Sequence, residues 1–243
     1  MRDVSKIKIW ENEPVLTKAD KNDFINFMMD CNVLRFGDFV TKSGRNTPYF
    51  INTGNYTTGK QSAKLGEYYA MKLYESVGTD FDCMFGPAYK GIPLVVSCAG
   101  KFAELVAFKG DDKPFCFNRK EVKDHGEGGN IVGYQPKDGD NVVIIEDVIT
   151  AGTAIRETLP ILNGAAKDLQ VTDMIISVDR CEVGKSGDKT AVQEVYDEFG
   201  IKVHPIITVK DIYNYFADKA DSDEEAAKRM AAMKAYMDKY CVL

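Results

Sequence analysis

The sequence predicts an α/β fold in which helices flank a parallel sheet. Short apolar runs typical of strands alternate along the chain with segments whose apolar residues recur at helical spacing, and this alternation indicates a parallel sheet. Residues Val142–Ile145 are apolar without interruption, as expected of a strand that is buried on both faces. A length of 243 residues permits one large domain or two small ones, and a hydrophobic fraction of 44% is sufficient for a core.

The expected elements can be taken in chain order. Residues 18–34 are expected to form a helix because five apolar residues recur on one face: Phe24, Phe27, Met28, Cys31 and Leu34. Residues 36–57, with glycines between β-forming residues, predict short strands and turns. Next we expect a helix over residues 61–77, a strand over 81–85, a helix near 92–102, and strands over 105–108 and 115–117. A long loop is expected over residues 118–135. After it we expect strands over residues 142–145 and 174–178, a helix over 190–199, a strand over 204–209, and a C-terminal helix that opens with a capping box at Ser222–Glu225. In that last helix, Met230, Met233 and Met237 share one face and are expected to pack rather than to bind a ligand.

Two carboxylates and a loop of small residues follow the central strand. Glu146 and Asp147 come directly after it, then the loop Thr150–Ala154, then a helix with apolar residues at positions 155, 159 and 162. Small residues at a helix N-terminus expose backbone N–H groups and the positive end of the helix dipole, which together favour a phosphate. The acids lie at the carboxyl end of a strand, where open α/β sheets bind ligands, and they suit sugar hydroxyls or a divalent cation. The alternative is that these acids only cap the helix, and the chemistry of the residues leaves both interpretations open.

Six linked motifs carry a resemblance to a known family. The segment Glu146–Ala154 resembles the 5-phosphoribosyl 1-diphosphate (PRPP) motif of type I phosphoribosyltransferases. Further segments resemble orotate phosphoribosyltransferases and occur in that family's order: Thr41–Arg45 with Pro48–Phe50, Phe85–Gly91, Phe117–Lys120, Lys123–Gly129 and Ser177–Arg180. The resemblance extends from about residue 21 to the C-terminus.

This resemblance implies a fold, an activity and partners. The fold would be that of type I phosphoribosyltransferases, with a twisted parallel sheet and a small N-terminal hood at about residues 18–57, within a domain over 18–243. Residues 1–17 would be an extension of unknown role. The activity would be transfer of the 5-phosphoribosyl group from PRPP to N1 of orotate, which yields orotidine 5'-monophosphate and diphosphate in pyrimidine biosynthesis. The resemblance also implies Mg²⁺ as cofactor and a homodimer that shares an active-site lid.

The resemblance also implies a role for particular residues. The 5-phosphate would bind the loop Val148, Ile149, Thr150, Ala151, Gly152, Thr153 and Ala154, and the ribose hydroxyls would bind Glu146 and Asp147. Glu146 departs from the usual aspartate by one methylene. The diphosphate would lie among Lys42, Tyr89, Lys90, Arg119, Lys120, Lys123 and His125, and orotate among Lys42, Phe50, Ile51, Thr150 and Arg180. Lys42, Lys90, Lys123, His125 and Asp147 would be catalytic, and Mg²⁺ would bind mainly through the substrate, near Glu146 and Asp147.

Alternatives remain for these residues and for the function. Arg180 suits a base that carries a carboxylate, but it can instead form a structural ion pair with Asp179 or Glu182. The lysines and the glycine-rich loop can be ordinary solvated surface. One rival function is a phosphoribosyltransferase for a purine or uracil, against which Arg180 and the hood residues Lys42 and Arg45 argue. The other is a non-catalytic regulator that binds nucleic acid or senses PRPP.

Composition excludes several classes of protein. The net charge of −6, the pI of about 5.1 and the lack of a Lys/Arg run argue against nucleic acid as a partner. No stretch approaches the roughly 20 apolar residues of a membrane span. Six cysteines without a C-x-x-C pair, and only two histidines, argue against a zinc site. Reduced thiols used as small apolar residues are expected instead, and they indicate a cytoplasmic protein.

Overall fold

A six-stranded sheet forms the centre of the molecule. The structure is a computed structural model that describes residues 15–41, 44–106, 112–120, 130–149 and 152–242. The strand order is β5-β4-β3-β6-β7-β8. All neighbouring strands are parallel except the edge strand β5, which is antiparallel to β4. The strands are β3 (Cys83–Gly86), β4 (Phe115–Asn118), β5 (Ile131–Gly133), β6 (Asn141–Ile145), β7 (Gln170–Asp179) and β8 (Lys202–Thr208). The predicted α/β fold with a parallel sheet is confirmed.

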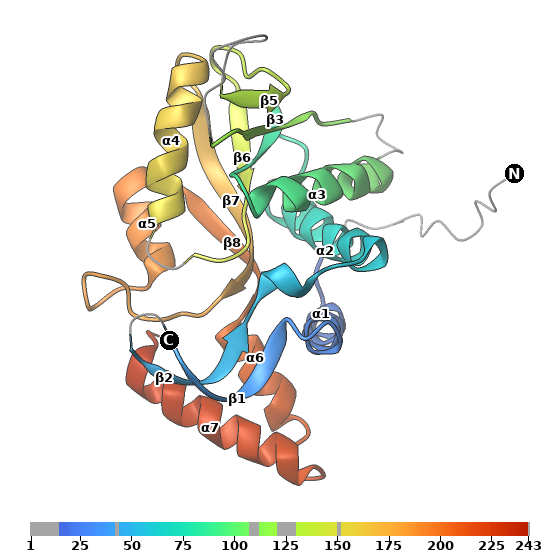
Figure 1. The fold of residues 1–243 in the computed structure, drawn as a ribbon, viewed down its shortest axis with the longest axis vertical. Helices are drawn as coiled ribbons and strands as arrows, with labels where there is room; N and C mark the ends of the chain where they lie inside the picture. Colours follow the sequence, from blue (N-terminus) through green and yellow to red (C-terminus); the bar gives the residue numbers. More distant parts are fainter. Residues whose placement is uncertain (1–14, 42–43, 107–111, 121–129, 150–151, 243) are drawn as a thin grey trace, which may run out of the picture.

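Helices cover both faces of this sheet. Helices α2 (Gly59–Val77) and α3 (Gly91–Val106) lie on one face, and α4 (Thr153–Ala165) and α5 (Ala191–Phe199) lie on the other (Figure 1). In β6, Val143 and Ile145 join the apolar core beneath α2 and α3, whereas Val142 and Ile144 join the core beneath α4 and α5. All four side chains are fully buried. This explains why the strand is apolar without alternation.

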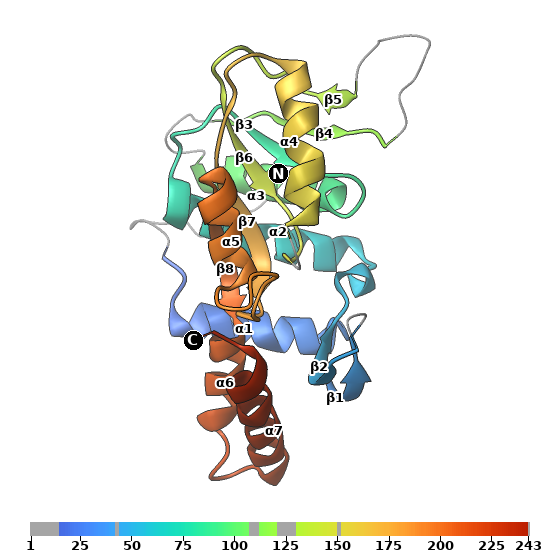
Figure 2. The same ribbon diagram turned by 90° about the vertical axis from the view of Figure 1, so that its left-hand side faces the viewer.

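The remaining elements form the hood and the C-terminal layer. Strands β1 (Leu34–Val40) and β2 (Asn46–Ile51) make a separate antiparallel pair, and helix α1 (Lys18–Asp30) packs against β1. Helices α6 (Val209–Ala217) and α7 (Glu224–Tyr240) pack together, and α7 packs on β2, so Figure 2 shows β1, β2, α6 and α7 at one end of the molecule. The 3-10 turn η2 (Thr53–Asn55) leads from the hood to α2. Among the described residues, no helix is both long and apolar enough to cross a membrane.

Several boundaries differ from those predicted. The helix expected over residues 18–34 ends at Asp30 because Asn32 takes a positive φ of 55°, and Leu34 begins β1. The strand expected over residues 105–108 is wrong at Leu105 and Val106, which extend the buried face of α3. The loop expected over residues 118–135 contains β5, which pairs with β4 and forms the edge of the sheet, and residues 121–129 of that loop lie outside the described residues.

The C-terminal region shows two further differences. The strand expected to end at Val209 ends at Thr208, whose side chain caps α6 in a capping box with Asp211. Helix α6 was not predicted, although this capping pattern was visible in the sequence. The N-cap of α7 is Asp223 rather than Ser222, because the Asp223 carboxylate accepts from the backbone N–H groups of the first turn. The methionine face of α7 packs as predicted: Met233 and Met237 are buried and Met230 is partly buried against the same core.

Candidate active site

Polar side chains from neighbouring strands meet at one edge of the sheet. Glu146 and Asp147 follow β6, and because β6 and β7 are parallel, Arg180 just beyond β7 lies at the same edge. The backbone N–H and the hydroxyl of Ser177 both donate to the carbonyl oxygen of Asp147, at 2.9 and 2.6 Å. Val148 then pairs with Val178. These contacts fix the backbone of the paired acids against β7.

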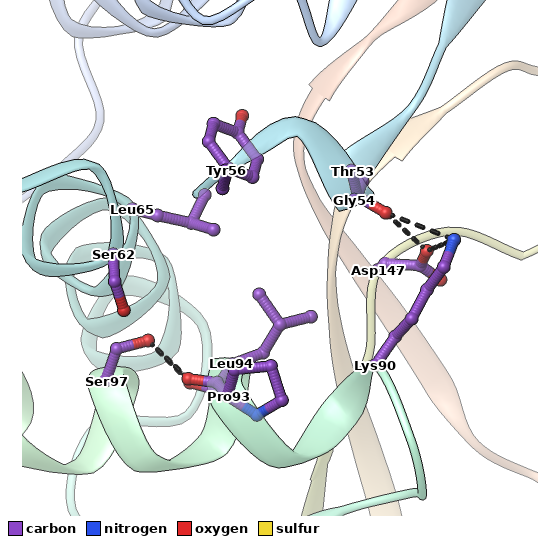
Figure 3. A pocket seen from close by; sticks show the side chains of 10 residues that line it. All are labelled: Thr53, Gly54, Tyr56, Ser62, Leu65, Lys90, Pro93, Leu94, Ser97 and Asp147. Carbon is purple, nitrogen blue, oxygen red and sulfur yellow. Dashed lines mark hydrogen bonds and ion pairs between the residues drawn. The ribbon is translucent and has the colours of Figure 1, made fainter. Parts of the chain in front are cut away.

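Asp147 is the centre of the polar contacts at this edge. Its Oδ2 atom accepts from Lys90 Nζ at 2.9 Å and from Thr53 Oγ1 at 2.8 Å, and its Oδ1 atom accepts from the Val148 N–H at 2.7 Å. Lys90 also donates to Thr53 Oγ1 at 3.2 Å, and Figure 3 shows the three side chains pointing toward one another. The Asp147 side chain is 10% exposed and that of Lys90 is 61% exposed. The structure therefore brings the predicted residues Lys90 and Asp147 together and adds Thr53 from the hood.

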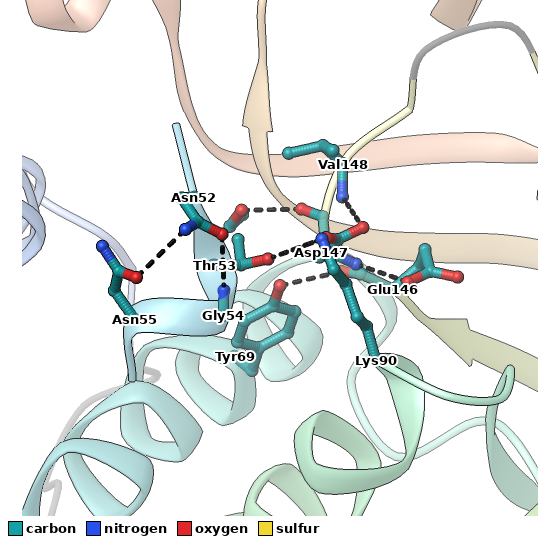
Figure 4. A network of polar contacts seen from close by, with 10 residues as sticks. Asn52, Thr53, Gly54, Asn55, Tyr69, Lys90, Glu146, Asp147 and Val148 are labelled. Carbon is teal, nitrogen blue, oxygen red and sulfur yellow. Dashed lines mark hydrogen bonds and ion pairs between the residues drawn. The ribbon is translucent and has the colours of Figure 1, made fainter. Parts of the chain in front are cut away.

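Glu146 lies in a different environment from its neighbour. Its carboxylate accepts from the Asp147 N–H at 2.9 Å, and its carbonyl oxygen accepts from the buried hydroxyl of Tyr69 at 2.8 Å (Figure 4). Burial raises the pKa of Glu146 to about 8. The hydrogen bond from Asp147 opposes this rise and the negative charge of Asp147 adds to it. Near neutral pH, Glu146 is therefore held largely protonated, whereas Asp147 is paired with a lysine.

A tight loop places Lys90 beside Asp147. A Cβ atom on Gly86 would lie 2.4 Å from the carbonyl oxygen of Gly91, and one on Gly91 would lie 2.7 Å from Cδ of Pro87, so both positions require glycine. The Ala88 N–H donates to the side chain of Asn118 at 2.8 Å, and the Ala88–Tyr89 peptide bond is cis. The loop is thus packed against the ends of β4 and β6.

The N-terminus of α4 borders the acids along the chain. Its N-cap, Gly152, has the left-handed conformation with φ of 65°, which favours glycine. Glycine has no side chain with which to cap the first N–H groups, so these remain suited to an anionic ligand. Val148 and Ile149 are half-buried, Thr153 begins the helix and Ala154 is exposed. The predicted phosphate-loop residues Thr150 and Ala151 lie outside the described residues.

A cavity of about 240 Å³ opens beside Asp147 and Lys90. Thr53 and Gly54 border it from the hood (Figure 3). Its other lining residues come from the segment between η2 and α2 and from helices α2 and α3: Tyr56, Ser62, Leu65, Pro93, Leu94 and Ser97. The Lys90–Asp147 pair therefore faces open space rather than the closed core.

Of the other predicted site residues, some lie within the described part of the chain and some lie outside it. Tyr89 is 65% exposed, and Lys120 Nζ lies 5.3 Å from the centre of its ring, so the structure brings these two together. Phe50 packs against Phe39 and Arg35 at the surface of the hood. Ile51 is half-buried, and the backbone N–H of Arg119 donates to the Asn130 carbonyl. Lys42, Lys123 and His125 lie outside the described residues.

Arg180 forms one of the two ion pairs that its sequence left open. Its Nε atom donates to Glu182 at 2.5 Å. Asp179 instead accepts from the N–H of Cys181 at 2.7 Å. The ion pair with Glu182 leaves the proposed role of Arg180 toward a substrate as a prediction.

Sequence reasoning did not identify four of the residues that build this edge: Thr53, Tyr69, Asn118 and Ser177. The segment around Thr53, Asn-Thr-Gly-Asn, is a turn pattern, and Ser177 begins one of the segments that carried the resemblance. Both were therefore visible as local patterns, but neither pattern indicates a contact with Asp147. Tyr69 lies within the helix predicted over residues 61–77, and helical spacing does not indicate a contact with Glu146.

Comparison with known proteins establishes the class of this chain. The phosphoribosyl transferase domain family matches residues 52–182, which include β3, β4, β6 and the paired acids. The fold and the site together define a phosphoribosyltransferase.

Individual relatives narrow the class. An orotate phosphoribosyltransferase of Clostridium acetobutylicum is 52% identical over 199 residues, which are 82% of this chain and 87% of the relative. That of Lachnoclostridium phytofermentans is 49% identical over 224 residues, 91% of this chain and 97% of the relative. The crystal structure of the orotate phosphoribosyltransferase of Francisella tularensis has a TM-score of 0.76 at 35% identity and covers 90% of this chain and 100% of its own. The chain belongs to the orotate phosphoribosyltransferase family.

Proposed function

We propose that the protein transfers the 5-phosphoribosyl group of PRPP to N1 of orotate, with orotidine 5'-monophosphate and diphosphate as products. One observation carries the proposal: Asp147 is held between Lys90 and Thr53 at the edge of the sheet, a few residues before the glycine N-cap of α4. This arrangement combines acceptors for sugar hydroxyls, a cation for a leaving group and a helix N-terminus for a phosphate. The names of the relatives supply the identity of the base.

Each part of the site then has a task in the reaction. The N-terminus of α4 binds the 5-phosphate through backbone N–H groups and the helix dipole. The Asp147 carboxylate accepts from a ribose hydroxyl. Glu146, which is largely protonated near neutral pH, can donate to a hydroxyl as well as accept from one. The substrate is thereby oriented by both of its ends, so that C1 faces the base.

Lys90 provides positive charge where negative charge develops. As the bond between C1 and the diphosphate breaks, the leaving group gains negative charge, and cations placed beforehand stabilise that charge. Lys90 is 61% exposed and already beside the acids, so it can exchange its contact with Asp147 for one with the diphosphate. We propose that Lys42, Tyr89, Arg119, Lys120, Lys123 and His125 complete this diphosphate site. Phe50, Ile51 and Arg180, with Lys42 and Thr150, would hold orotate.

The donor set suits a Mg²⁺ ion that is bound mainly through the substrate. Among the described residues, no group of three or more His, Cys, Asp and Glu side chains could hold a metal ion. Asp147 offers carboxylate oxygens, which are the ligands that Mg²⁺ accepts in small number together with substrate oxygens. Glu146, whose pKa is raised by burial, would have to lose its proton to serve as a ligand, and a neighbouring cation favours that loss. A bound Mg²⁺ supplies positive charge to the diphosphate. We therefore propose it as the cofactor, with these two residues nearest to it.

One assay tests the proposed reaction against its rivals. Orotate is mixed with PRPP, Mg²⁺ and the protein, and the loss of orotate absorbance is followed together with diphosphate release. A panel of uracil, adenine, guanine and hypoxanthine is run in parallel. Diphosphate release with another base but not with orotate would overturn the base assignment. Binding of PRPP without turnover of any base would favour the non-catalytic regulator.

We also propose that two copies share their lids in a homodimer, so that Lys123 and His125 act in the active site of the neighbouring subunit, whereas Asp147 acts in the site of its own subunit. The support is the family resemblance, and a two-fold interface makes such an exchange reciprocal. Lys123→Ala and Asp147→Asn, each nearly inactive alone, are unfolded, mixed in equal amounts and refolded. With random pairing, half of the dimers are mixed and one of the two sites in each is intact, so about a quarter of wild-type activity is expected. No recovery, with exchange of subunits shown independently, would rule out sharing.

The location that we propose is the cytoplasm. All six cysteines are free, and five of them are buried. Unpaired thiols are typical of proteins in a reducing compartment.

A further inference from the structure

The guanidinium of Arg180 is enclosed by residues from three separate parts of the fold. Tyr49 of β2 places its ring beneath the guanidinium, 4.6 Å from the Arg180 Cζ atom to the ring centre. Glu182, two residues along the chain, accepts from Arg180 Nε at 2.5 Å. The hydroxyl of Tyr236, on the C-terminal helix α7, accepts from Arg180 Nη2 at 3.3 Å. One face, one edge and one further nitrogen of the guanidinium are therefore in contact with protein.

The Tyr236 hydroxyl is hydrogen-bonded to both Arg180 and Glu182. While it accepts from Arg180, it donates to Glu182 Oε1 at 2.5 Å. Burial raises the pKa of Tyr236 to about 12, and the hydrogen bond to Glu182 adds to this rise, so the hydroxyl keeps its proton at neutral pH. A neutral hydroxyl that donates to the carboxylate and accepts from the guanidinium fixes the distance between them as well as their orientation.

Glu182 pairs with a second guanidinium as well. It forms an ion pair with Arg45, with 3.6 Å between Oε2 and Nη1. Two guanidinium groups thus share one carboxylate. Burial alone lowers the pKa of Arg180, but its interactions with Tyr49, Glu182 and Tyr236 outweigh this effect and raise it. Arg180 therefore stays charged, and a guanidinium has more N–H donors than these contacts use.

Residues at the end of the chain are hydrogen-bonded to the segment that follows Arg180. The N–H of Val242 donates to the Cys181 carbonyl at 2.9 Å, and the N–H of Val183 donates to the Tyr240 carbonyl at 2.9 Å. The ring of Tyr236 also meets that of Tyr49 edge-on, with centres 5.7 Å apart. The segment that carries Arg180 and Glu182 is thus tied on both sides to α7 and its C-terminal extension.

We propose that Tyr236 is a positioning residue, which acts through Glu182 to hold Arg180 in the orientation that receives the carboxylate of the base. This inference rests on the proposed function, in which Arg180 binds that carboxylate. Arginine loses considerable conformational freedom when it is held in one orientation. A guanidinium that is already held before the substrate arrives avoids that loss during binding. Helix α7, far from the phosphate site along the chain, thereby contributes to the choice of base.

The test is the removal of one hydroxyl. Tyr236→Phe keeps the ring that packs on Tyr49 and removes only the hydrogen bonds to Glu182 and Arg180. We expect the KM for orotate to rise about fivefold, because Arg180 must then be ordered as orotate binds, with kcat, the KM for PRPP and the melting temperature unchanged. Tyr240→Phe, four residues along the same helix, is the matched control and should leave both KM values unchanged.

A second variant shows whether the effect passes through Arg180. In an Arg180→Ala background, Tyr236→Phe should not raise the KM for orotate further, because the group that it positions is absent. A purely structural role would lower the melting temperature and raise both KM values alike, and this result would overturn the inference. So would an unchanged KM for orotate in Tyr236→Phe, or a full fivefold rise in the Arg180→Ala background. Wild-type protein that converts no orotate would overturn the proposed function itself, which distinguishes the two failures.

Discussion

Replacement of Glu146 by glutamine should make the stability of the protein less dependent on pH. Glu146 is 7% exposed, and burial raises its pKa from 4.5 to about 8. Between these two pH values the folded chain holds a proton that the unfolded chain has released. The free energy of unfolding must therefore fall as the pH rises through this window. Glutamine has nearly the same shape and no charge, so it removes this contribution.

The magnitude follows from the width of the window. At about 1.4 kcal/mol for each pH unit, the interval from 4.5 to about 8 corresponds to about 5 kcal/mol. Glu146 lies next to Asp147, which borders the cavity, and water that enters around an ionised carboxylate lowers the cost of burying it. We therefore expect Glu146→Gln to be more stable than the wild type by roughly 2–4 kcal/mol at pH 9 and about equally stable at pH 5.

Denaturant unfolding at several pH values between 5 and 9 measures this difference. Glu224→Gln is a suitable control, because the side chain of Glu224 is 85% exposed on α7, and its difference from the wild type should be the same at every pH. If the difference between Glu146→Gln and the wild type does not change with pH, the assignment of a protonated Glu146 is wrong.

Three further variants, and a fourth that serves as a control, test the site and the packing around it. Asp147→Asn should keep the fold by circular dichroism but lower kcat about a hundredfold or more, since it removes the negative charge that accepts from the ribose hydroxyl and pairs with Lys90; a wild-type rate would contradict the role of the paired acids. Arg180→Ala should weaken orotate binding by about 2–4 kcal/mol in calorimetry and leave PRPP binding unchanged, so equal weakening of both substrates would count against it. Gly66→Ala should lower the free energy of unfolding by about 1–3 kcal/mol, because the added Cβ would lie 2.4 Å from the Ser97 carbonyl oxygen between α2 and α3. Gly100→Ala, where a Cβ meets no atom of the described residues within 4 Å, should be neutral or slightly stabilising. If Gly66→Ala and Gly100→Ala lower the free energy of unfolding equally, the packing argument is refuted.

The sequence was most informative where the physics is local. The unbroken apolar run Val142–Ile145 predicted a strand that is buried on both faces, and the structure confirms it. Because the two acids directly follow this strand, they were predicted to lie at the carboxyl edge of the sheet. Local patterns were weaker at boundaries. Leu105 and Val106 fit a strand as well as a helix, and only the helix buries them against the sheet beneath α3.

The charge state of the paired acids was decided by the tertiary structure. Glu146 and Asp147 are adjacent in sequence and have similar ordinary pKa values, so nothing local distinguishes them. Burial beneath α2 raises the pKa of Glu146, whereas Asp147 faces Lys90. Desolvation depends on which atoms exclude water, and that is a property of the whole fold.

By itself, the sequence determined the family, the alternation of strands and helices, and the edge of the sheet at which the site lies, because these follow from periodicity and from contiguous motifs. Only the tertiary structure decided which distant residues complete the site. Thr53 reaches Asp147 across 94 positions of chain, and Tyr236 reaches Arg180 across 56. Such contacts depend on how the hood and the C-terminal helices pack on the sheet, and a local pattern contains no information about that packing.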